Sequence, residues 1–325
     1  MKQGLKILGY VVSGLLAVLL IGPFFLPVSG ARGTASAAEL AAENGSFVEV
    51  GDLTVYTEQV GEGEPVIILL HGYGASVYSW RRVMPPLAEY GTVIAYDRPA
   101  FGFTERPLPA AWKGKANPYR GSSQPDLLVG LMDELGIEQA ILVGHSAGGR
   151  AAVLTALSYP ERVSALVLVD PALYGEMSPG WLQVLSGIPQ VDRLAPFLVR
   201  SIQERGVEII YRAWHNPALV TEDVIAAYKE PLQLASWDRA LWEYSKVAGD
   251  AVVGNRLGEL DLPVLVVTGE DDQVVPTEES VQAAEDIPGA QLAVFPDCGH
   301  VPNEECPEAF LDAVEPFLAR VGVSH

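Results

Sequence analysis

Ser146 is the residue whose surroundings point most directly to chemistry. It lies in Gly144-His145-Ser146-Ala147-Gly148, directly after the apolar run Ala140-Ile141-Leu142-Val143. A Gly-x-Ser-x-Gly pattern between a strand and a helix is typical of a nucleophile elbow, a tight turn that holds the serine oxygen at the edge of a sheet. The glycines leave room where a β-carbon would collide with the neighbouring strand and helix. A serine hydroxyl is a weak nucleophile, so the chain must also supply a base and an acid that orients the base.

The base is expected among five histidines: His71, His145, His215, His300 and His325. His325 is the last residue, and His145 is next to the serine in the turn, so its side chain should point away from the serine hydroxyl. His300 lies in Asp297-Cys298-Gly299-His300, in the loop after the last predicted strand. That loop lies at the carboxyl edge of the sheet, near Ser146, so His300 is the predicted general base.

The acid should lie between the serine and the histidine in the chain. Three consecutive acids, Glu270, Asp271 and Asp272, follow the predicted strand 264–268. They fit either a polar turn that caps the next helix or one carboxylate that orients the imidazole. Asp170, after the preceding strand, is a second candidate, and the residues alone leave these alternatives open.

An oxyanion hole completes such a site, and each of its N–H donors contributes about 2.7–4 kcal/mol of transition-state stabilisation. One donor is expected to be the backbone N–H of Ala147, the residue after the serine. The other should come from the loop after the first central strand, within Leu69-Leu70-His71-Gly72-Tyr73-Gly74. The glycines of this loop allow its backbone to face a ligand.

Short apolar runs that alternate with amphipathic stretches must position these residues. Strands are predicted at 47–50, 53–60, 66–70, 92–96, 139–143, 163–169, 264–268 and 291–295. Helices are predicted at 79–90, 124–135, 147–158, 277–286 and 307–320. This alternation predicts an α/β fold with a mostly parallel, doubly wound, eight-stranded sheet and a ligand site at the carboxyl ends of its strands.

The stretch between Val169 and Leu262 does not fit the strand–helix alternation. It holds four of the six tryptophans, Trp181, Trp214, Trp237 and Trp242. It is predicted to form several helices that lie over the strand ends as a cap. These tryptophans are expected to form the core of the cap itself.

Five motifs in this order resemble the α/β-hydrolase superfamily, in its capped serine-hydrolase branch. In chain order they are His71-Gly72-Tyr73-Gly74, Tyr96-Asp97-Arg98-Pro99-Ala100-Phe101-Gly102, the elbow, Gly269-Glu270-Asp271-Asp272 and Cys298-Gly299-His300. The resemblance covers about residues 46–320. It implies a cap inserted after the sixth strand and the chain order Ser, Asp, His.

The same resemblance implies the remaining site residues. In the family pattern Gly-x-x-Asp the acid is the fourth residue, here Asp272. The family's oxyanion donors correspond to the N–H groups of Tyr73 and Ala147. Haloalkane dehalogenases and epoxide hydrolases look similar around these motifs but use an aspartate as nucleophile, and this chain has Ser146 there.

The predicted function is therefore hydrolysis of a carboxylic ester with a small or apolar acyl or alcohol group. Ser146, His300 and Asp272 would act through an acyl-enzyme, with no cofactor. Two alternatives stay open. The first is hydrolysis with the same triad of either a carbon–carbon bond in a diketone or another acyl compound. The second is an inactive membrane-tethered binding protein. The substrate is expected to be a small molecule; the sequence does not predict the oligomeric state.

Composition restricts the partners. The formal net charge is −20, which argues against a nucleic-acid partner, since binding to nucleic acid requires a basic face. Cys298 and Cys306 are the only cysteines, and no Cys/His spacing suits zinc, so no metal site is expected. A disulfide between the two cysteines is an open alternative in an exported protein. Two unpaired thiols are favoured, since the cysteines are close in sequence and would close only a small loop.

The N-terminus predicts a membrane location. Residues 7–28 carry no charge and follow Lys2 and Lys6. Residues 1–28 are expected to form a single-pass anchor with the catalytic domain outside the cytoplasm, or else a signal segment cleaved near Ala35-Ser36-Ala37 to release a secreted protein. Residues 29–45 are predicted to be a linker. The predicted domains are a core of 46–171 and 262–325 and a cap of 172–261.

Overall fold

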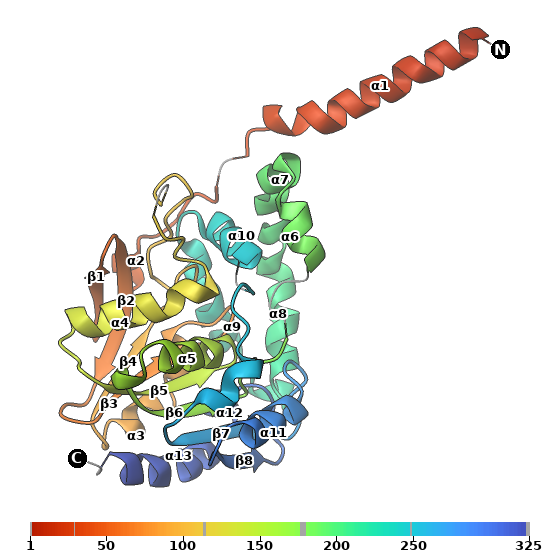
Figure 1. The fold of residues 1–325 in the computed structure, drawn as a ribbon. Helices are drawn as coiled ribbons and strands as arrows, with labels where there is room; N and C mark the ends of the chain where they lie inside the picture. The colour runs from red at the N-terminus through yellow and green to blue at the C-terminus, as the bar shows by residue number, and fades with distance from the viewer. Residues whose placement is uncertain (1, 29, 113–114, 176–179, 248, 323–325) are drawn as a thin grey trace.

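A mixed eight-stranded sheet forms the centre of the protein. The computed structural model describes residues 2–28, 30–112, 115–175, 180–247 and 249–322. The strands are β1 (Gly45–Val50), β2 (Leu53–Val60), β3 (Val66–Leu70), β4 (Thr92–Tyr96), β5 (Ala140–His145), β6 (Val163–Val169), β7 (Val264–Gly269) and β8 (Gln291–Phe295). Their order is β1-β2-β4-β3-β5-β6-β7-β8, and only the pairs β1–β2 and β2–β4 are antiparallel. The predicted mostly parallel sheet is thus confirmed (Figure 1).

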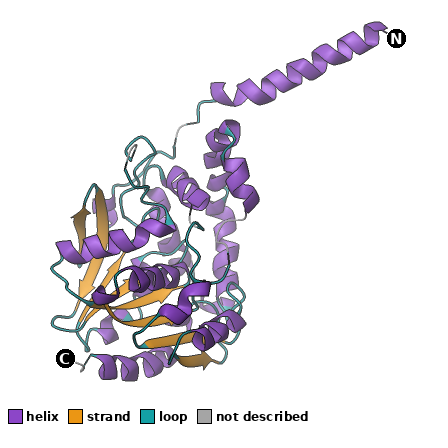
Figure 2. Cartoon of the chain, in the orientation of Figure 1, coloured by secondary structure: helices purple, strands orange, loops and turns teal. Residues whose placement is uncertain are grey.

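Helices cover both faces of this sheet (Figure 2). These helices are α3 (Met84–Leu87), α4 (Gln124–Glu134), α5 (Ala147–Ser158), α11 (Thr277–Asp286), α12 (Pro302–Glu305) and α13 (Pro307–Val321). The packing on both faces of strand β3 explains why its sequence is apolar throughout. Ile68 packs in the hydrophobic cluster shared with α4, α5 and α11, and Ile67 packs in the cluster shared with α3 and α13. A strand buried on both faces has no position for a polar side chain.

One predicted helix is interrupted. The stretch 79–90 contains a 3₁₀ turn at Val77–Trp80 and the four-residue helix α3, instead of one continuous helix. Pro85 and Pro86 occupy the first turn of α3. Proline has no N–H to donate to the preceding turn, so a helix can start at these residues but cannot run through them.

The insertion after β6 is helical, as predicted for a cap. It contains α6 (Gly180–Ser186), α7 (Pro189–Arg200), α8 (Ile202–Ala213), α9 (Glu222–Lys229) and α10 (Trp237–Val247). Three of its tryptophans are at most 5% exposed: Trp214, Trp237 and Trp242. Trp181 is 63% exposed and therefore does not join the buried aromatic residues.

The N-terminal segment forms α1 (Lys2–Phe25), which extends away from the sheet (Figure 1). Among the described residues, no helix has both the length and the apolar character that crossing a membrane requires. The predicted membrane location is therefore wrong. Within the uncharged stretch 7–28, helix α1 ends at Phe25 and contains Pro23.

The residues after α1 lie against the cap. Ala31 N donates to Asp238 Oδ1 at 3.0 Å, and Thr34 N donates to Gln233 O at 2.8 Å. The short helix α2 (Ala37–Leu40) follows and leads into β1. The stretch predicted to be a linker thus makes defined contacts with α10 and the turn before it.

The two cysteines form a disulfide, so the prediction of unpaired thiols is wrong. Cys298 and Cys306 are eight residues apart, and their Cα atoms are 6.2 Å apart. Helix α12 lies between them and turns the chain back on itself, which brings the two side chains together. The small loop that this disulfide closes contains His300.

Candidate active site

Ser146 lies on strained backbone between β5 and α5. Its φ is +52°, a conformation that non-glycine residues rarely adopt. A β-carbon on Gly148 would lie 2.1 Å from Leu70 O, and one on Gly144 would lie 2.6 Å from the Cα of Gly149. Both positions therefore require glycine. Ser146 N donates to Val169 O at 2.8 Å, which ties the turn to the end of β6.

His300 is held by Asp272. The distance between His300 Nδ1 and Asp272 Oδ2 is 2.6 Å, and both side chains are buried. The other oxygen, Asp272 Oδ1, accepts hydrogen bonds from Val274 N at 2.7 Å and Val275 N at 2.9 Å. Ser146 and His300 line the same cavity. Among the described residues, the Ser146 hydroxyl makes no hydrogen bond to His300, and such bonds often tighten only when substrate binds.

The other candidate acids have different partners. The Asp271 side chain is 44% exposed, and its Oδ2 lies 2.9 Å from His215 Nδ1. Asp170 is buried, and its Oδ1 accepts hydrogen bonds from Thr268 Oγ1 at 2.7 Å and Gly269 N at 3.1 Å. Of the three acids in the turn after β7, the one whose carboxylate contacts His300 is thus Asp272.

His71 holds the backbone of the loop after β3. Its Nδ1 lies 2.8 Å from Gly72 O, and its Nε2 accepts a hydrogen bond from Arg98 N at 2.9 Å. Burial lowers the pKa of His71 to about 3, with a further contribution from Arg98. The imidazole is therefore neutral, donates from one nitrogen and accepts at the other.

His145 is nearer the site than the sequence predicts. It lines the cavity, and its ring centroid lies 4.8 Å from that of His300. Its Nε2 lies 2.7 Å from His300 O, so it donates to the backbone of the base and not to the serine. Burial and the nearby His300 lower the pKa of His145 to about 3.

The two residues predicted to supply oxyanion donors, Tyr73 and Ala147, come from different elements near the cavity. Ala147 is the first residue of α5, so its N–H has no acceptor within the helix. Tyr73 is in the loop after β3 and lines the cavity with Ser146. A β-carbon on Gly72 would lie 2.8 Å from His145 Nδ1 and 3.2 Å from Ser146 Cβ, so glycine lets this loop approach the elbow.

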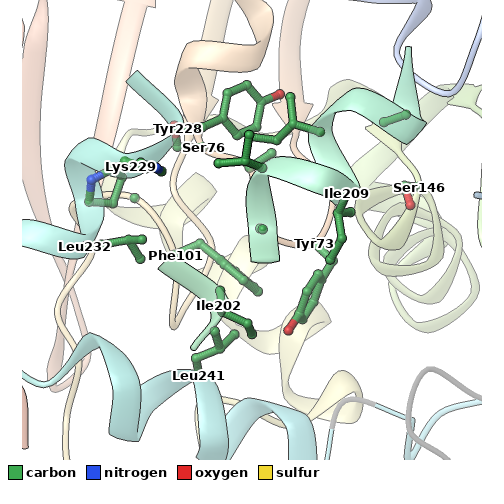
Figure 3. Close-up of a pocket in the computed structure, with 18 of the residues that line it drawn as sticks. Tyr73, Ser76, Phe101, Ser146, Ile202, Ile209, Tyr228, Lys229, Leu232 and Leu241 are labelled. Carbon is green, nitrogen blue, oxygen red and sulfur yellow. The ribbon is translucent and has the colours of Figure 1, made fainter. Parts of the chain in front are cut away.

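The cavity above Ser146 has a volume of about 220 Å³ and mostly apolar walls. The core contributes Tyr73 and Phe101, and the cap contributes Ile202, Trp214, Trp237 and Leu241. Figure 3 shows Ile202 and Leu241 approaching from the cap helices. The predicted cap therefore forms one wall of the pocket.

Two cations also line this cavity, and sequence reasoning missed both. Lys229, at the end of α9, is exposed and lies on the opposite side of the cavity from Ser146 in Figure 3. Arg106 donates from a terminal nitrogen to Gly102 O, while its Nε is buried without a hydrogen-bond partner. Burial lowers the pKa of Arg106 to about 10, so it stays charged at neutral pH.

Two consecutive acids in α12 connect the His300 loop to the cap. Glu305 accepts hydrogen bonds from Gly299 N and His215 N at 2.9 Å and from Asn216 N at 2.6 Å. The buried carboxylate of Glu304 accepts from Tyr228 of α9 and from Arg81. No local sequence pattern indicates these contacts, because all of these partners except Gly299 lie 76 or more residues away in the chain.

In the part of the chain that the structure describes, two side-chain clusters bring together groups of the kinds that bind metal ions. In one, Cys298 and Cys306 are joined as a disulfide, so their sulfurs cannot bind as thiolates. In the other, Asp170, Asp272 and His300 lie within 4.8 Å of one another, but His300 Nδ1 is hydrogen-bonded to Asp272. The donor chemistry of both clusters fits their structural partners better than an ion.

Residues 65–307 match the family described as the alpha/beta hydrolase fold, and the chain therefore belongs to this family. It is 30% identical over 289 residues to the 2-hydroxy-6-oxo-6-phenylhexa-2,4-dienoate hydrolase of Burkholderia cepacia, covering 83% of this chain and 93% of that protein. It is 31% identical to the 2-hydroxy-6-oxo-2,4-heptadienoate hydrolase of Pseudomonas putida, covering 86% and 97%. The structure of a meta-cleavage product hydrolase from Pseudomonas fluorescens, complexed with acetates, matches with a TM-score of 0.68 and 28% identity, covering 86% and 98%.

These similarities support a hydrolase and change the expected substrate. The names of the two dienoate hydrolases describe a conjugated keto acid and not an ester. They therefore favour the carbon–carbon bond alternative over the predicted ester hydrolysis.

Proposed function

We propose that this protein is a serine hydrolase that cleaves a carbon–carbon bond in a 2-hydroxy-6-oxo-2,4-dienoate. The main support is that Ser146 shares a cavity with the Asp272-bound His300, in a chain similar over most of its length to dienoate hydrolases. The catalytic residues we propose are Ser146, His300 and Asp272, with the N–H groups of Tyr73 and Ala147 as the oxyanion hole.

The reaction begins with the keto tautomer, in which the proton of the C2 hydroxyl has moved to C5. Ser146 Oγ attacks C6 while His300 Nε2 takes the serine proton, and the oxyanion forms opposite the two backbone N–H groups. The C5–C6 bond then breaks, and its electron pair passes along the conjugated chain to the oxygen at C2, which takes up a proton. Water activated by His300 releases the carboxylic acid from Ser146, so the net change is the addition of one water.

The cavity suits both ends of such a substrate. Lys229 and Arg106 supply positive charge for the C1 carboxylate, and Lys229 lies on the side away from Ser146 (Figure 3). Aliphatic and aromatic side chains of the cap surround the rest of the cavity and fit the conjugated chain and an apolar group on C6.

A substrate comparison tests this proposal. We expect kcat/KM for 2-hydroxy-6-oxo-6-phenylhexa-2,4-dienoate to exceed that for 4-nitrophenyl acetate on the order of 100-fold, because the ester lacks the carboxylate and the conjugated leaving group. Ser146→Ala should abolish turnover of both compounds and labelling by a fluorophosphonate probe. A higher kcat/KM for the ester would reject the carbon–carbon assignment, and a folded wild-type protein that no serine probe labels would indicate an inactive binding protein.

A further inference from the structure

A second buried carboxyl lies behind the proposed acid. We propose that Asp170 is a protonated carboxylic acid that donates a hydrogen bond to Asp272 and so holds Asp272 against His300. Asp170 would be a positioning residue, since it acts through Asp272 and does not touch the substrate. This inference rests on the proposed function of Ser146, His300 and Asp272, and it adds a fourth member to that arrangement.

The two oxygens of Asp170 have different surroundings. Oδ1 accepts hydrogen bonds from Thr268 Oγ1 at 2.7 Å and from Gly269 N at 3.1 Å, as the carbonyl oxygen of an acid can. Oδ2 is buried and has no hydrogen-bond partner among the described residues. The polar atoms of Asp170, Asp272 and His300 lie within 4.8 Å of one another. A proton on Oδ2 would give this oxygen a partner in Asp272.

The donors around the pair show which carboxyl keeps the negative charge. Asp272 accepts from two backbone N–H groups and from His300, whereas Asp170 accepts from one hydroxyl and one N–H. When two carboxyl groups share a buried site, ionising the second one costs much more free energy than ionising the first. The charge therefore belongs to Asp272 and the proton to Asp170.

The remaining titratable groups agree with this assignment. Burial and the adjacent Asp272 raise the pKa of Asp170 well above its usual range. His145, whose ring packs against His300, is neutral because burial lowers its pKa. Glu279 of α11 is a further acid on the Asp272 side, and no arginine or lysine of the described residues forms an ion pair with Asp170. Arg150 of α5 donates from Nε to Ala172 O at 2.8 Å instead, so among the described residues no ion pair keeps Asp170 ionised.

The backbone at Asp170 guides the choice of variants. Its φ is +42°, in the left-handed region that asparagine, aspartate and glycine adopt most readily. Asp170→Gly removes the donor and tolerates this backbone. Asp170→Asn keeps an oxygen for Thr268 and Gly269 and supplies an amide N–H to Asp272, but it can never carry a negative charge.

The experiment measures the second-order rate of fluorophosphonate inactivation across pH, which requires Ser146 and His300 but not a particular substrate. We expect Asp170→Gly to react about tenfold more slowly, because Asp272 loses one of its hydrogen-bond donors. We expect Asp170→Asn to restore most of that rate and to keep the midpoint of the acid limb within about 0.3 pH units of wild type, because no charge has been removed.

Two results would overturn the proposal. If Asp170 were ionised in the wild type, Asp170→Asn would remove a negative charge near the imidazole and move the acid midpoint down by about one pH unit or more. If Asp170→Gly reacted as fast as Asp170→Asn, the hydrogen bond to Asp272 would have no role. Asp170→Asn tests whether Asp170 is ionised in the wild type even if Asp170→Gly does not fold. A wild type that cleaves no dienoate but reacts with the probe rejects only the substrate assignment, and one that does not react with the probe rejects both proposals.

Discussion

In the proposed mechanism, the two ring nitrogens of His300 have separate tasks. Nδ1 lies 2.6 Å from Asp272 Oδ2, so this nitrogen carries the proton that it donates to the carboxylate. Nε2 is then left unprotonated and able to accept the serine proton. The direction of a single hydrogen bond therefore decides whether His300 can act as a base toward Ser146.

Asp272→Asn should reverse this direction. The amide can donate to Nδ1 and so favour the tautomer with its proton on Nε2, and we expect kcat to fall about 10⁴-fold while the fold persists. Asp271→Asn is a matched control, because Asp271 is the neighbouring acid and its exposed side chain contacts His215 instead. Turnover at pH 7 and thermal unfolding of both variants test this. Equal losses of activity in the two variants would contradict the assignment of Asp272.

At the scale of elements, the loop that carries His300 is held from two sides. The Cys298–Cys306 disulfide closes it, and Glu305 joins its Gly299 N–H to two N–H groups of the cap. His300 N also donates to Ala213 O of α8 at 2.7 Å. The cap therefore contributes to the position of the base as well as to the wall of the cavity.

Glu305→Ala should remove the connection between the loop and the cap. Three backbone N–H groups lose their acceptor, so we expect the free energy of unfolding to fall by about 3 kcal/mol and kcat/KM to fall as His300 moves. Glu305→Gln keeps one acceptor oxygen, so its free energy of unfolding should lie between those of Glu305→Ala and wild type.

Glu308→Ala is the control. It replaces an exposed acid at the start of α13 and should lower the free energy of unfolding by less than about 1 kcal/mol. Chemical denaturation and kcat/KM test the series, and an Ala variant as active and stable as the Glu308 control would refute the role of Glu305.

The elements themselves were largely predictable. Helix 147–158 and strand 163–169 match the structure to the residue, because apolar periodicity and short-range turn signals determine them. The elbow and its partners could be placed because each follows a strand that must end at the same edge of the sheet. The contacts of Glu305 and the cysteine pairing depend on how distant segments fold back, and no local pattern carries that information.

At the scale of the whole molecule, core and cap are distinct in sequence but joined around the cavity. We propose to keep the division into a core of 46–171 and 262–325, a cap of 172–261, an N-terminal segment of 1–28 and a connecting segment of 29–45.

The core buries several titratable groups, and their pKa values make folding depend on pH. Burial raises the pKa of Asp97 to about 7, whereas it lowers that of His71 to about 3. Acids and histidines in the core therefore affect acid stability in opposite directions.

His71→Gln isolates one of these contributions. In the unfolded chain His71 has a pKa near 6.5, so between pH 6.5 and about 3 the unfolded state binds a proton that the folded state does not. Stability is consequently lost as the pH falls through this window, by about 2 kcal/mol between pH 7 and pH 5 for this residue alone. Glutamine offers an acceptor for Arg98 N, but its single amide does not also reproduce the imidazole's contact with Gly72 O, so the variant should be less stable at pH 7. Because glutamine does not titrate, the difference in unfolding free energy from wild type should narrow by about 2 kcal/mol at pH 5.

His215→Gln is the control: its contact with Asp271 raises the pKa of His215, so its difference from wild type should not narrow at pH 5. Urea denaturation at the two pH values measures both differences, and an unchanged gap for His71→Gln would mean that the buried imidazole is already charged at pH 5.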